Sequence, residues 1–272
     1  MNERGDFDLS GKVALITGGA GILGQAFCRG LARNGAKLAV VDIDTEAAKR
    51  TAKAIAAEFG TETMGVGCDI TGPAEVADMT AAVTDRYGGI DILHNNAAAK
   101  TADLGAFFAP FEDYDLRTWR EVMAVNIDAM FLVAQSVGKA MVDRKQGGSI
   151  IQTSSIYGIL APDQRIYEGS EYMGRPINTP PSYSVSKAAV VGLTNYLSTY
   201  WADANIRVNT LTPGGVESGQ NEMFKEKYSA RIPLGRMADA DEIVGALVFL
   251  ASDASSYITG QNIVVDGGLS VW

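Results

Sequence analysis

The chain has 272 residues, of which 47% are hydrophobic and 20% are charged. This composition is typical of a globular protein and excludes a disordered or fibrous one. The 30 glycines follow no repeat, which also excludes collagen-like and low-complexity chains. The net charge is −9, and a surface this acidic repels phosphate groups. We therefore expect neither a nucleic acid nor an anionic membrane as a partner.

Cysteine and histidine are scarce. Cys28 and Cys68 lie in apolar stretches and are expected to be reduced core residues, so the sequence predicts no disulfide framework and no metal site. His94 is the only histidine, which is too few for most zinc sites or for a histidine-based catalytic triad. Any acid–base chemistry must therefore mostly use other side chains.

No targeting or membrane-spanning segment is evident. The first twelve residues, MNERGDFDLSGK, are polar and lack the apolar core of a signal peptide. No uncharged apolar run approaches the ~18 residues that suggest a membrane span. We therefore expect a soluble protein of the cytoplasm.

Short apolar runs alternate with segments of helical periodicity along almost the whole chain. The expected strands are Lys12–Thr17, Lys37–Asp42, Thr63–Cys68, Ile90–Asn95, Ser149–Thr153, Ile206–Leu211 and Asn262–Val265. The expected helices are Ile22–Arg33, Thr45–Phe59 (with an N-cap at Asp44 or Thr45), Pro73–Tyr87, Leu116–Asp143, Ser182–Ala204 and Ala240–Ala251.

Seven strands rich in Val, Ile and Leu and joined by helices predict an α/β fold with a parallel sheet covered on both faces. A (β/α)₈ barrel is the alternative. The glycines directly after the first strand favour a doubly wound, Rossmann-type sheet, because such a sheet has its phosphate loop at that place. No linker or internal repeat divides the chain, so we expect a single domain over residues 1–272.

One segment interrupts the alternation. Residues 159–181 (ILAPDQRIYEGSEYMGRPINTPP) lie between a strand and a helix and contain four prolines. Connections of this length are uncommon in compact domains and often form functional lids. A surface insertion without a function is the alternative.

A glycine-rich loop, TGGAGILG, follows the first strand and opens the first helix. Within it, Gly19, Gly21 and Gly24 match the pattern G-x-G-x-x-G. Glycines at these places permit a tight turn, a close approach of the backbone to a pyrophosphate, and packing of the helix on the strand. The N-terminus of the helix then faces the phosphates. The loop is a candidate dinucleotide-binding site.

Asp42 stands at the end of the second strand, 18 residues beyond Gly24. A carboxylate at this place can accept hydrogen bonds from the ribose hydroxyls of adenosine, and it repels a 2′-phosphate. The glycine loop contains no Arg or Lys, and none follows Asp42 directly. The sequence therefore favours NAD over NADP. The alternative is that Asp42 merely caps the following helix.

Tyr183 and Lys187 are four residues apart in an expected helix, so their side chains share one face. An ammonium group near a phenol is expected to lower the tyrosine pKa from about 10 toward neutral pH. Such a pair can transfer protons without a histidine. Ser155, at the end of the strand before the insertion, can supply a hydroxyl group to the same edge of the sheet.

Together, these motifs resemble the short-chain dehydrogenase/reductase family. The resemblance runs from about Leu9 to the C-terminus, and it also rests on Asn95-Asn96-Ala97-Ala98, Ser155-x-x-Gly158, Pro213-Gly214, Thr259-Gly260 and Asp266-Gly267-Gly268. It implies nicotinamide-dependent hydride transfer between an alcohol and a carbonyl group. It also implies that Tyr183 is the general acid/base, that Lys187 binds the nicotinamide ribose and tunes Tyr183, and that Ser155 holds the substrate oxygen.

Further roles follow from the same resemblance. Asn126 matches a residue that supports a proton relay, and Asp69 matches a residue beside the adenine. The implied cofactor-binding set is Gly18, Gly19, Gly21, Ile22, Leu23, Gly24, Asp42, Ile43, Asp69, Ile70, Asn96, Ala97, Tyr183, Lys187, Pro213, Gly214 and Val216. His94 stands where the family usually has an aliphatic residue, and we interpret it as a buried, hydrogen-bonded imidazole near the cofactor. Met123, Met130 and Met141 are interpreted as packing residues.

The sequence departs from the family pattern at two places. The common glycine loop would have Gly where Ile22 stands, and we treat this loop as a variant. Ser155 and Tyr183 are 28 positions apart, where about a dozen residues are usual, because the insertion lies between them. Ser154 and Ser182 are therefore alternatives for the hydroxyl that holds the substrate.

The insertion supplies candidate substrate contacts, chiefly Arg165, Tyr167, Glu171 and Arg175, with Glu168 and Tyr172 beside them. Arginine suits a carboxylate or phosphate, and Glu and Tyr suit sugar hydroxyls. We expect a small, polar, hydroxylated and sugar-derived substrate, either neutral or anionic. The insertion and loop are similar to those of bacterial members linked to flagellin sugar and nonulosonic acid biosynthesis, and gluconate 5-dehydrogenases are a broader match.

Two other functions stay open. A 3-oxoacyl thioester reductase would need a basic surface for an acyl carrier, and normally NADPH, which the acidic charge and Asp42 disfavour. A non-catalytic NAD-binding sensor or scaffold is the alternative of another class. The family resemblance further implies a homotetramer or homodimer paired through Leu116–Asp143 and Ser182–Ala204. Leu269–Trp272 is a further candidate contact.

Overall fold

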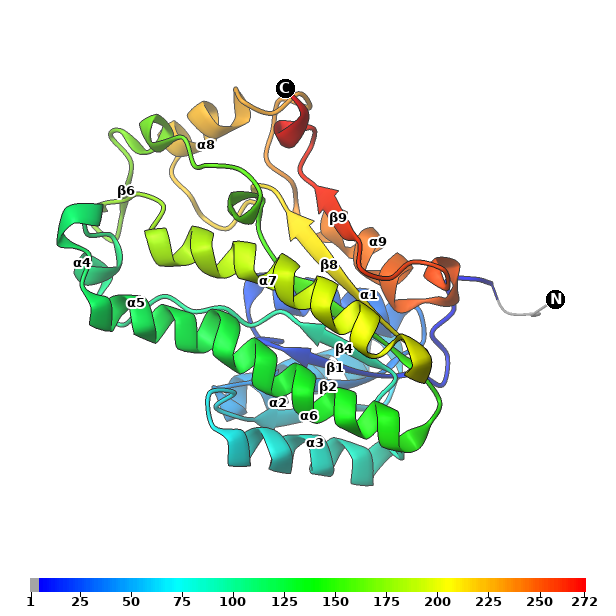
Figure 1. Ribbon diagram of the computed structural model, residues 1–272. Coiled ribbons are helices and arrows are strands. Elements are labelled where there is room, and N and C mark those ends of the chain that lie inside the picture. Colours follow the sequence, from blue (N-terminus) through cyan, green and yellow to red (C-terminus); the bar gives the residue numbers. More distant parts are fainter. Residues whose placement is uncertain (1–4) are drawn as a thin grey trace.

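The computed structural model describes residues 5–272, and its centre is a sheet of seven strands that all run parallel. The strand order is β3-β2-β1-β4-β5-β8-β9 (Figure 1). These strands are β1 (Val13–Thr17), β2 (Lys37–Asp42), β3 (Thr63–Gly67), β4 (Ile92–Asn95), β5 (Gly148–Thr153), β8 (Ile206–Pro213) and β9 (Asn262–Val265). The order reverses between β1 and β4, as in a doubly wound Rossmann-type sheet. The predicted fold class is confirmed, and the barrel is excluded.

Helices cover both faces of the sheet because successive strand residues point to opposite sides. Val13 and Leu15 pack into a core with α3 (Pro73–Tyr87), α6 (Ala129–Arg144) and α7 (Pro181–Tyr200). Ala14 and Ile16 pack into a second core with α1 (Ile22–Arg33), α2 (Thr45–Phe59) and α9 (Ala240–Ala251). A strand that is buried on both faces has no polar side, which explains the uninterrupted apolar runs in the sequence.

The long helix predicted from Leu116 to Asp143 consists of three parts. α5 (Leu116–Met123) and α6 are joined by one wider π-turn over Ala124–Asp128. By length and composition, the combined helix Leu116–Arg144 is apolar enough to cross a membrane, and core helices of globular proteins have the same properties. Here its apolar residues Val133, Val137 and Met141 are buried against the sheet. Met130 is buried as well, as predicted for a packing residue.

The structure shows which residue caps α2 and where the two cysteines lie. The side chain of Asp44 accepts a hydrogen bond of 2.9 Å from the backbone N–H of Ala47, so Asp44 is the N-cap of α2. Cys28 and Cys68 are free thiols that are buried on opposite faces of the sheet. Burial raises the pKa of Cys28 to about 12, because a thiolate loses its hydration there.

Residues 159–181 have more regular structure than predicted. They contain a short turn of 3₁₀ helix at Gln164–Tyr167 and a small antiparallel hairpin of β6 (Glu171–Tyr172) and β7 (Arg175–Pro176). The segment lies over the sheet edge between two further helices, α4 (Leu104–Phe107) and α8 (Glu222–Ser229) (Figure 1).

Hydrogen bonds fasten the insertion to the elements on both sides of it. The Lys227 ammonium donates to the carbonyl oxygen of Glu168 at 2.8 Å, which ties the insertion to α8. The Asn178 amide donates to the carbonyl oxygen of Phe108 at 3.0 Å, directly after α4. The insertion therefore bridges two segments that are far apart in sequence.

Candidate active site

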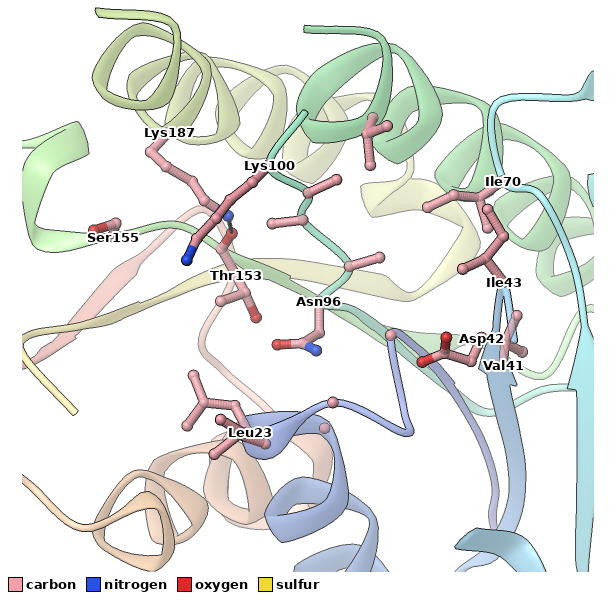
Figure 2. A pocket seen from close by; sticks show the side chains of 18 of the residues that line it. Leu23, Val41, Asp42, Ile43, Ile70, Asn96, Lys100, Thr153, Ser155 and Lys187 are labelled. Carbon is pink, nitrogen blue, oxygen red and sulfur yellow. Dashed lines mark hydrogen bonds between the residues drawn. The ribbon is translucent and has the colours of Figure 1, made fainter. Parts of the chain in front are cut away.

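A cleft of about 630 Å³ opens at the carboxyl ends of the central strands. Figure 2 shows it from close by, with Asp42 at one end and Ser155 and Lys187 at the other. Most of the predicted cofactor-binding residues line it, namely Gly18, Gly21, Ile22, Leu23, Gly24, Asp42, Ile43, Asp69, Ile70, Asn96, Ala97, Tyr183, Lys187, Pro213, Gly214 and Val216. The exception is Gly19, which packs beneath the loop against Val40 of β2 and does not line the cleft.

The glycine loop needs residues without a side chain because its backbone folds back on itself. A Cβ atom at Gly24 would lie 2.0 Å from the carbonyl oxygen of Gly18, which nothing but glycine permits. Gly18 has a φ of +64°, a conformation that other residues rarely adopt. These glycines let the first turn of α1 line the cleft.

The N-terminus of α1 fits a phosphate group. Its N-cap is Gly21, and no side chain accepts a hydrogen bond from the backbone N–H groups of the first turn. These groups carry the positive end of the helix dipole. Ile22, Leu23 and Gly24 of this turn line the cleft. The pyrophosphate of a dinucleotide would supply the acceptors that the first turn lacks.

Two carboxylates line the end of the cleft beside β2 and β3. Asp42 accepts hydrogen bonds from the backbone N–H groups of Ala20, at 3.1 Å, and of Asp44, at 3.2 Å. The N-cap of α2 is Asp44, so the alternative that Asp42 caps this helix is wrong. Asp69 is held by Thr71, whose hydrogen bonds lower the pKa of the Asp69 carboxyl group. This end of the cleft therefore offers fixed hydrogen-bond acceptors.

The catalytic end is built around Lys187, which is only 2% exposed. Its ammonium donates to the carbonyl oxygen of Thr153 at 3.0 Å and lies 6.0 Å from the ring centre of Tyr183. Burial lowers the pKa of Lys187 to about 8, because the charged form loses its hydration. α7 thus brings both members of the predicted pair to the end of β5.

Burial, and not the ammonium of Lys187, has the larger effect on the pKa of Tyr183. Burial raises the pKa of the Tyr183 phenol, and a hydrogen bond with Ser155 only partly offsets this increase. The desolvation of a phenolate outweighs the nearby ammonium, which is already bonded to the Thr153 carbonyl. The prediction that the Tyr183 pKa falls is therefore wrong for the protein by itself.

The three candidate serines are now distinguished by their partners. Ser155 is the one that is hydrogen-bonded to Tyr183. The hydroxyl of Ser154 donates to the backbone carbonyl of Lys187 at 2.6 Å. Ser182 shares a hydrogen bond of 2.6 Å with the hydroxyl of Tyr114. Ser155 is therefore the serine that stands next to the tyrosine of the pair, despite the insertion between them.

Asn126 is fully buried in the π-turn and does not line the cleft. Its side-chain oxygen accepts from the backbone N–H of Ala99 at 3.0 Å, and its amide donates to Ser186 at 3.2 Å. It therefore joins the loop after β4 to α7. Asn126 is therefore placed to position the loop after β4 relative to α7, without touching a ligand in the cleft.

His94 lies beneath the same region. It is completely buried, shares a hydrogen bond of 2.8 Å with the Thr153 hydroxyl, and packs edge-on against Phe27. Burial lowers the pKa of His94 to about 3, so the imidazole is neutral at physiological pH. The prediction of a buried, hydrogen-bonded imidazole is confirmed.

The predicted substrate contacts in the insertion do not line the cleft. Arg165 is 84% exposed and forms an ion pair of 2.8 Å with Asp163. Arg175 is exposed and lies against Gly105 of α4. The hydroxyl of Tyr167 is bonded to Thr179 at 2.6 Å, and Glu171 is exposed. Arg165 is paired with Asp163 and Arg175 lies beside α4, and neither residue lines the cleft, so their part in substrate binding loses its support.

Other lining residues are absent from the prediction. They are Val41, Cys68, Thr71, Ala98, Ala99, Lys100, Val125, Thr153 and Ser218. Of these, Lys100 is the one with a charged side chain. Its signal in the sequence is a single lysine that follows a run of alanines just after the fourth strand.

The burial of Lys187 predicts a pH-dependent stability. The pKa of about 8 in the folded protein lies below the ordinary 10.5, so the folded form binds fewer protons between these values. The buried charge therefore destabilises the protein below pH 8, and this penalty fades as the pH rises. We expect the unfolding free energy of the wild type, relative to Lys187→Met, to increase by roughly 2 to 3 kcal/mol between pH 7 and pH 10.

Urea unfolding at a series of pH values measures this difference. Lys53→Met, which removes an exposed lysine of α2, is the matched control, and we expect its difference from the wild type not to change with pH. A Lys187→Met difference that is equally flat would contradict the proposed cost of burying this ammonium.

Comparison with known proteins agrees with this geometry over nearly the whole chain. A family model described as "Enoyl-(Acyl carrier protein) reductase" matches residues 18–270. A D-threitol dehydrogenase from Mycolicibacterium smegmatis is 36% identical, and the match covers 98% of this chain and 95% of that protein.

Solved structures are equally similar. A short-chain type dehydrogenase/reductase from Mycobacterium marinum is 34% identical, with a TM-score of 0.85 and 98% of both chains covered. A gluconate 5-dehydrogenase from Burkholderia cenocepacia, solved in complex with NADP and tartrate, is 33% identical, with a TM-score of 0.86 and 98% of both chains covered. The chain therefore belongs to the short-chain dehydrogenase/reductase family of nicotinamide-dependent oxidoreductases.

Proposed function

We propose that the protein is an NAD-dependent dehydrogenase that interconverts a hydroxyl and a carbonyl group of a small sugar-derived substrate. The proposal rests on one observation: a single cleft contains both the catalytic residues and the residues suited to a dinucleotide. Ser155, Tyr183 and Lys187 lie at one end, and the uncapped N-terminus of α1 and Asp42 lie at the other. The similar proteins named for threitol and gluconate support a polyhydroxylated substrate.

Residues of the chain bind the reacting hydroxyl group and transfer its proton. A bound nicotinamide supplies or accepts the hydride at the substrate carbon. Ser155 donates a hydrogen bond to the substrate oxygen, and the Tyr183 phenol gives or takes the proton at that oxygen. Lys187 stabilises the deprotonated form of Tyr183. Burial raises the pKa of Tyr183, so the phenol is protonated at neutral pH and can donate the proton that carbonyl reduction needs. The rate of alcohol oxidation, which needs the deprotonated form, is expected to increase as the pH rises.

Asp42 supports NAD as the cofactor. Its carboxylate lines the cleft where the adenosine ribose would lie, and a 2′-phosphate there would be repelled. Among the lining residues of the described chain, the basic ones are Lys100 and Lys187, and both belong to the catalytic end. The similar gluconate 5-dehydrogenase was solved with NADP, and a direct comparison of the two cofactors therefore tests this proposal.

Other functions have weaker support. A thioester reductase must dock an acidic acyl carrier, and the net charge of −9 opposes such a partner. A non-catalytic sensor would not need Ser155, Tyr183 and Lys187 to meet in one cleft. Turnover of any hydroxylated substrate excludes the sensor.

The acid–base role of Tyr183 is tested by Tyr183→Phe. We expect kcat to fall at least about 100-fold, because the proton transfer is lost, while NAD binding changes little. Steady-state kinetics and NAD titration measure the two effects, and Tyr257→Phe, on a fully exposed tyrosine, is the matched control. A Tyr183→Phe enzyme with nearly normal kcat would refute the assignment.

The role of Asp42 is tested by comparing the two cofactors. We expect the wild type to have a higher kcat/KM with NAD⁺ than with NADP⁺. Asp42→Asn should shift this ratio toward NADP⁺ by about tenfold or more, because it removes the charge repulsion. Asp78→Asn, an equal charge loss on an exposed face of α3, should not shift it. A wild type that prefers NADP⁺ would overturn the interpretation of Asp42.

We propose that the chain forms a homodimer or homotetramer through α6 and α7. Phe131, Tyr196 and Tyr200 line a groove between these helices and are between 46% and 66% exposed. Light scattering coupled to size-exclusion chromatography should give a mass of two or four times the 28.8 kDa of one chain. The mass of a single chain would contradict this proposal.

A further inference from the structure

The insertion, residues 159–181, runs directly into the helix that carries Tyr183. Thr179 and Pro180 are the last residues before α7, and Tyr183 lies in the first turn of that helix. Apart from Tyr183 itself, the lining of the cleft includes nothing from this part of the described chain between Ser155 and Lys187. Any effect of the insertion on the reaction must therefore pass through the position of α7.

Thr179 is fixed by the 3₁₀ turn Gln164–Tyr167 near the start of the insertion. The hydroxyl of Tyr167 shares a hydrogen bond of 2.6 Å with the Thr179 hydroxyl. The side chain of Gln164 accepts from the backbone N–H of Thr179 at 3.3 Å and donates to its carbonyl oxygen at 3.4 Å. Thr179 is only 6% exposed, so a lost partner would leave a buried polar group unpaired. The bond to Tyr167 is the shortest of the three.

Two prolines connect Thr179 to the catalytic tyrosine. The rings of Pro180 and Pro181 fix φ near −65°, and a residue before a proline is itself confined to extended backbone. The carbonyl oxygen of Pro180 accepts from the backbone N–H of Tyr183 at 3.1 Å. The short connection therefore has little freedom to absorb a displacement of Thr179, and the displacement reaches Tyr183.

The start of α7 depends on side chains from other segments. Its N-cap is Pro180, which offers no side-chain acceptor to the first turn. The hydroxyl of Ser182 is bonded to that of Tyr114 at 2.6 Å on one side. The bond between Tyr167 and Thr179 comes from the insertion. The first turn is thus held by contacts from outside the helix.

The turn that carries Tyr167 is itself supported by α8. The Lys227 ammonium donates to the carbonyl oxygen of Glu168 at 2.8 Å, and the ring of Tyr167 lies 5.4 Å from that of Phe224, centre to centre. Tyr167 and Tyr183 both pack against the apolar cluster that includes Phe224. The hydroxyl of Tyr167 is therefore held in one place beside the start of α7.

We propose, on the basis of the dehydrogenase function proposed above, that Tyr167 is a positioning residue that fixes Tyr183 through Thr179. The insertion then assists the reaction without touching the substrate. Proton transfer needs the Tyr183 hydroxyl within hydrogen-bond reach of the substrate oxygen, and a misplacement of about 1 Å can cost up to about 100-fold in rate. Loss of the bond to Thr179 therefore slows turnover without weakening binding.

Tyr167→Phe tests this role in the full chain, with NAD⁺ and the best substrate from a panel of short alditols and aldonates. We expect kcat and kcat/KM both to fall about tenfold, while KM and the Kd for NAD⁺ change less than about twofold. Thr179→Val removes the same bond and keeps the backbone contacts with Gln164, so we expect the same loss. Thr179→Ser retains the hydroxyl and should retain most of kcat.

A double-mutant cycle shows whether the two hydroxyls act through their mutual bond. In that case the double variant Tyr167→Phe/Thr179→Val has the same kcat as either single variant. Tyr87→Phe is the matched control, because Tyr87 is also half-buried and its hydroxyl donates to the Leu38 carbonyl at 3.4 Å, near the start of β2 and away from the cleft. We expect the control to retain the wild-type kcat.

The possible failures can be told apart. A kcat within about twofold of the wild type in Tyr167→Phe or Thr179→Val overturns the role of Tyr167 and leaves the proposed function standing. Losses that multiply in the double variant, or that occur in KM alone, also overturn it. Thr179→Val and Thr179→Ser decide the question by themselves if Tyr167→Phe does not fold. Absence of wild-type turnover with the whole panel overturns the proposed function and this role together.

Discussion

Parallel pairing of all seven strands places their carboxyl ends along one edge of the sheet, and each part of the cleft is attached to that edge. The glycine loop follows β1, Asp42 ends β2, and Lys100 follows β4. Ser155 comes just after β5, where α7 packs. Residues from positions 18 to 218 are thereby brought to one cleft without long loops of their own. This arrangement is the reason that open parallel sheets bind ligands at this edge.

Burial of polar groups beneath the catalytic end determines how the site behaves. The Thr153 carbonyl holds the Lys187 ammonium, and the Thr153 hydroxyl holds the neutral imidazole of His94. These hydrogen bonds leave the Nδ1 atom of His94 without a partner among the described residues. Desolvation lowers the pKa of Lys187 and raises that of Tyr183. In the protein by itself, the phenol is therefore the stable form of Tyr183. The site thus has a proton donor ready for carbonyl reduction.

Much of the fold could be predicted from the sequence, because apolar runs and helical periods are local signals. All seven strands of the sheet coincide with predicted apolar runs to within two residues at either end, and α1, α2, α3 and α9 have the predicted bounds. The contacts of the insertion could not be predicted, since pairs such as Lys227 with the Glu168 carbonyl join distant segments. Arg165 looked like a substrate ligand, yet Asp163 is only two residues away and pairs with it. Lys100 was overlooked because no motif includes it, although its place after β4 put it at the sheet edge.

We infer that Ser155 and Tyr183 hold the reacting hydroxyl group of the substrate at the end of the cleft opposite Asp42. The most direct measurement is a crystal structure of the Tyr183→Phe protein with NAD⁺ and a polyhydroxylated substrate bound. We expect a substrate hydroxyl within hydrogen-bond distance of Ser155 and close to the ring edge at position 183. A substrate bound elsewhere in the cleft, with no hydroxyl at Ser155, would contradict this inference.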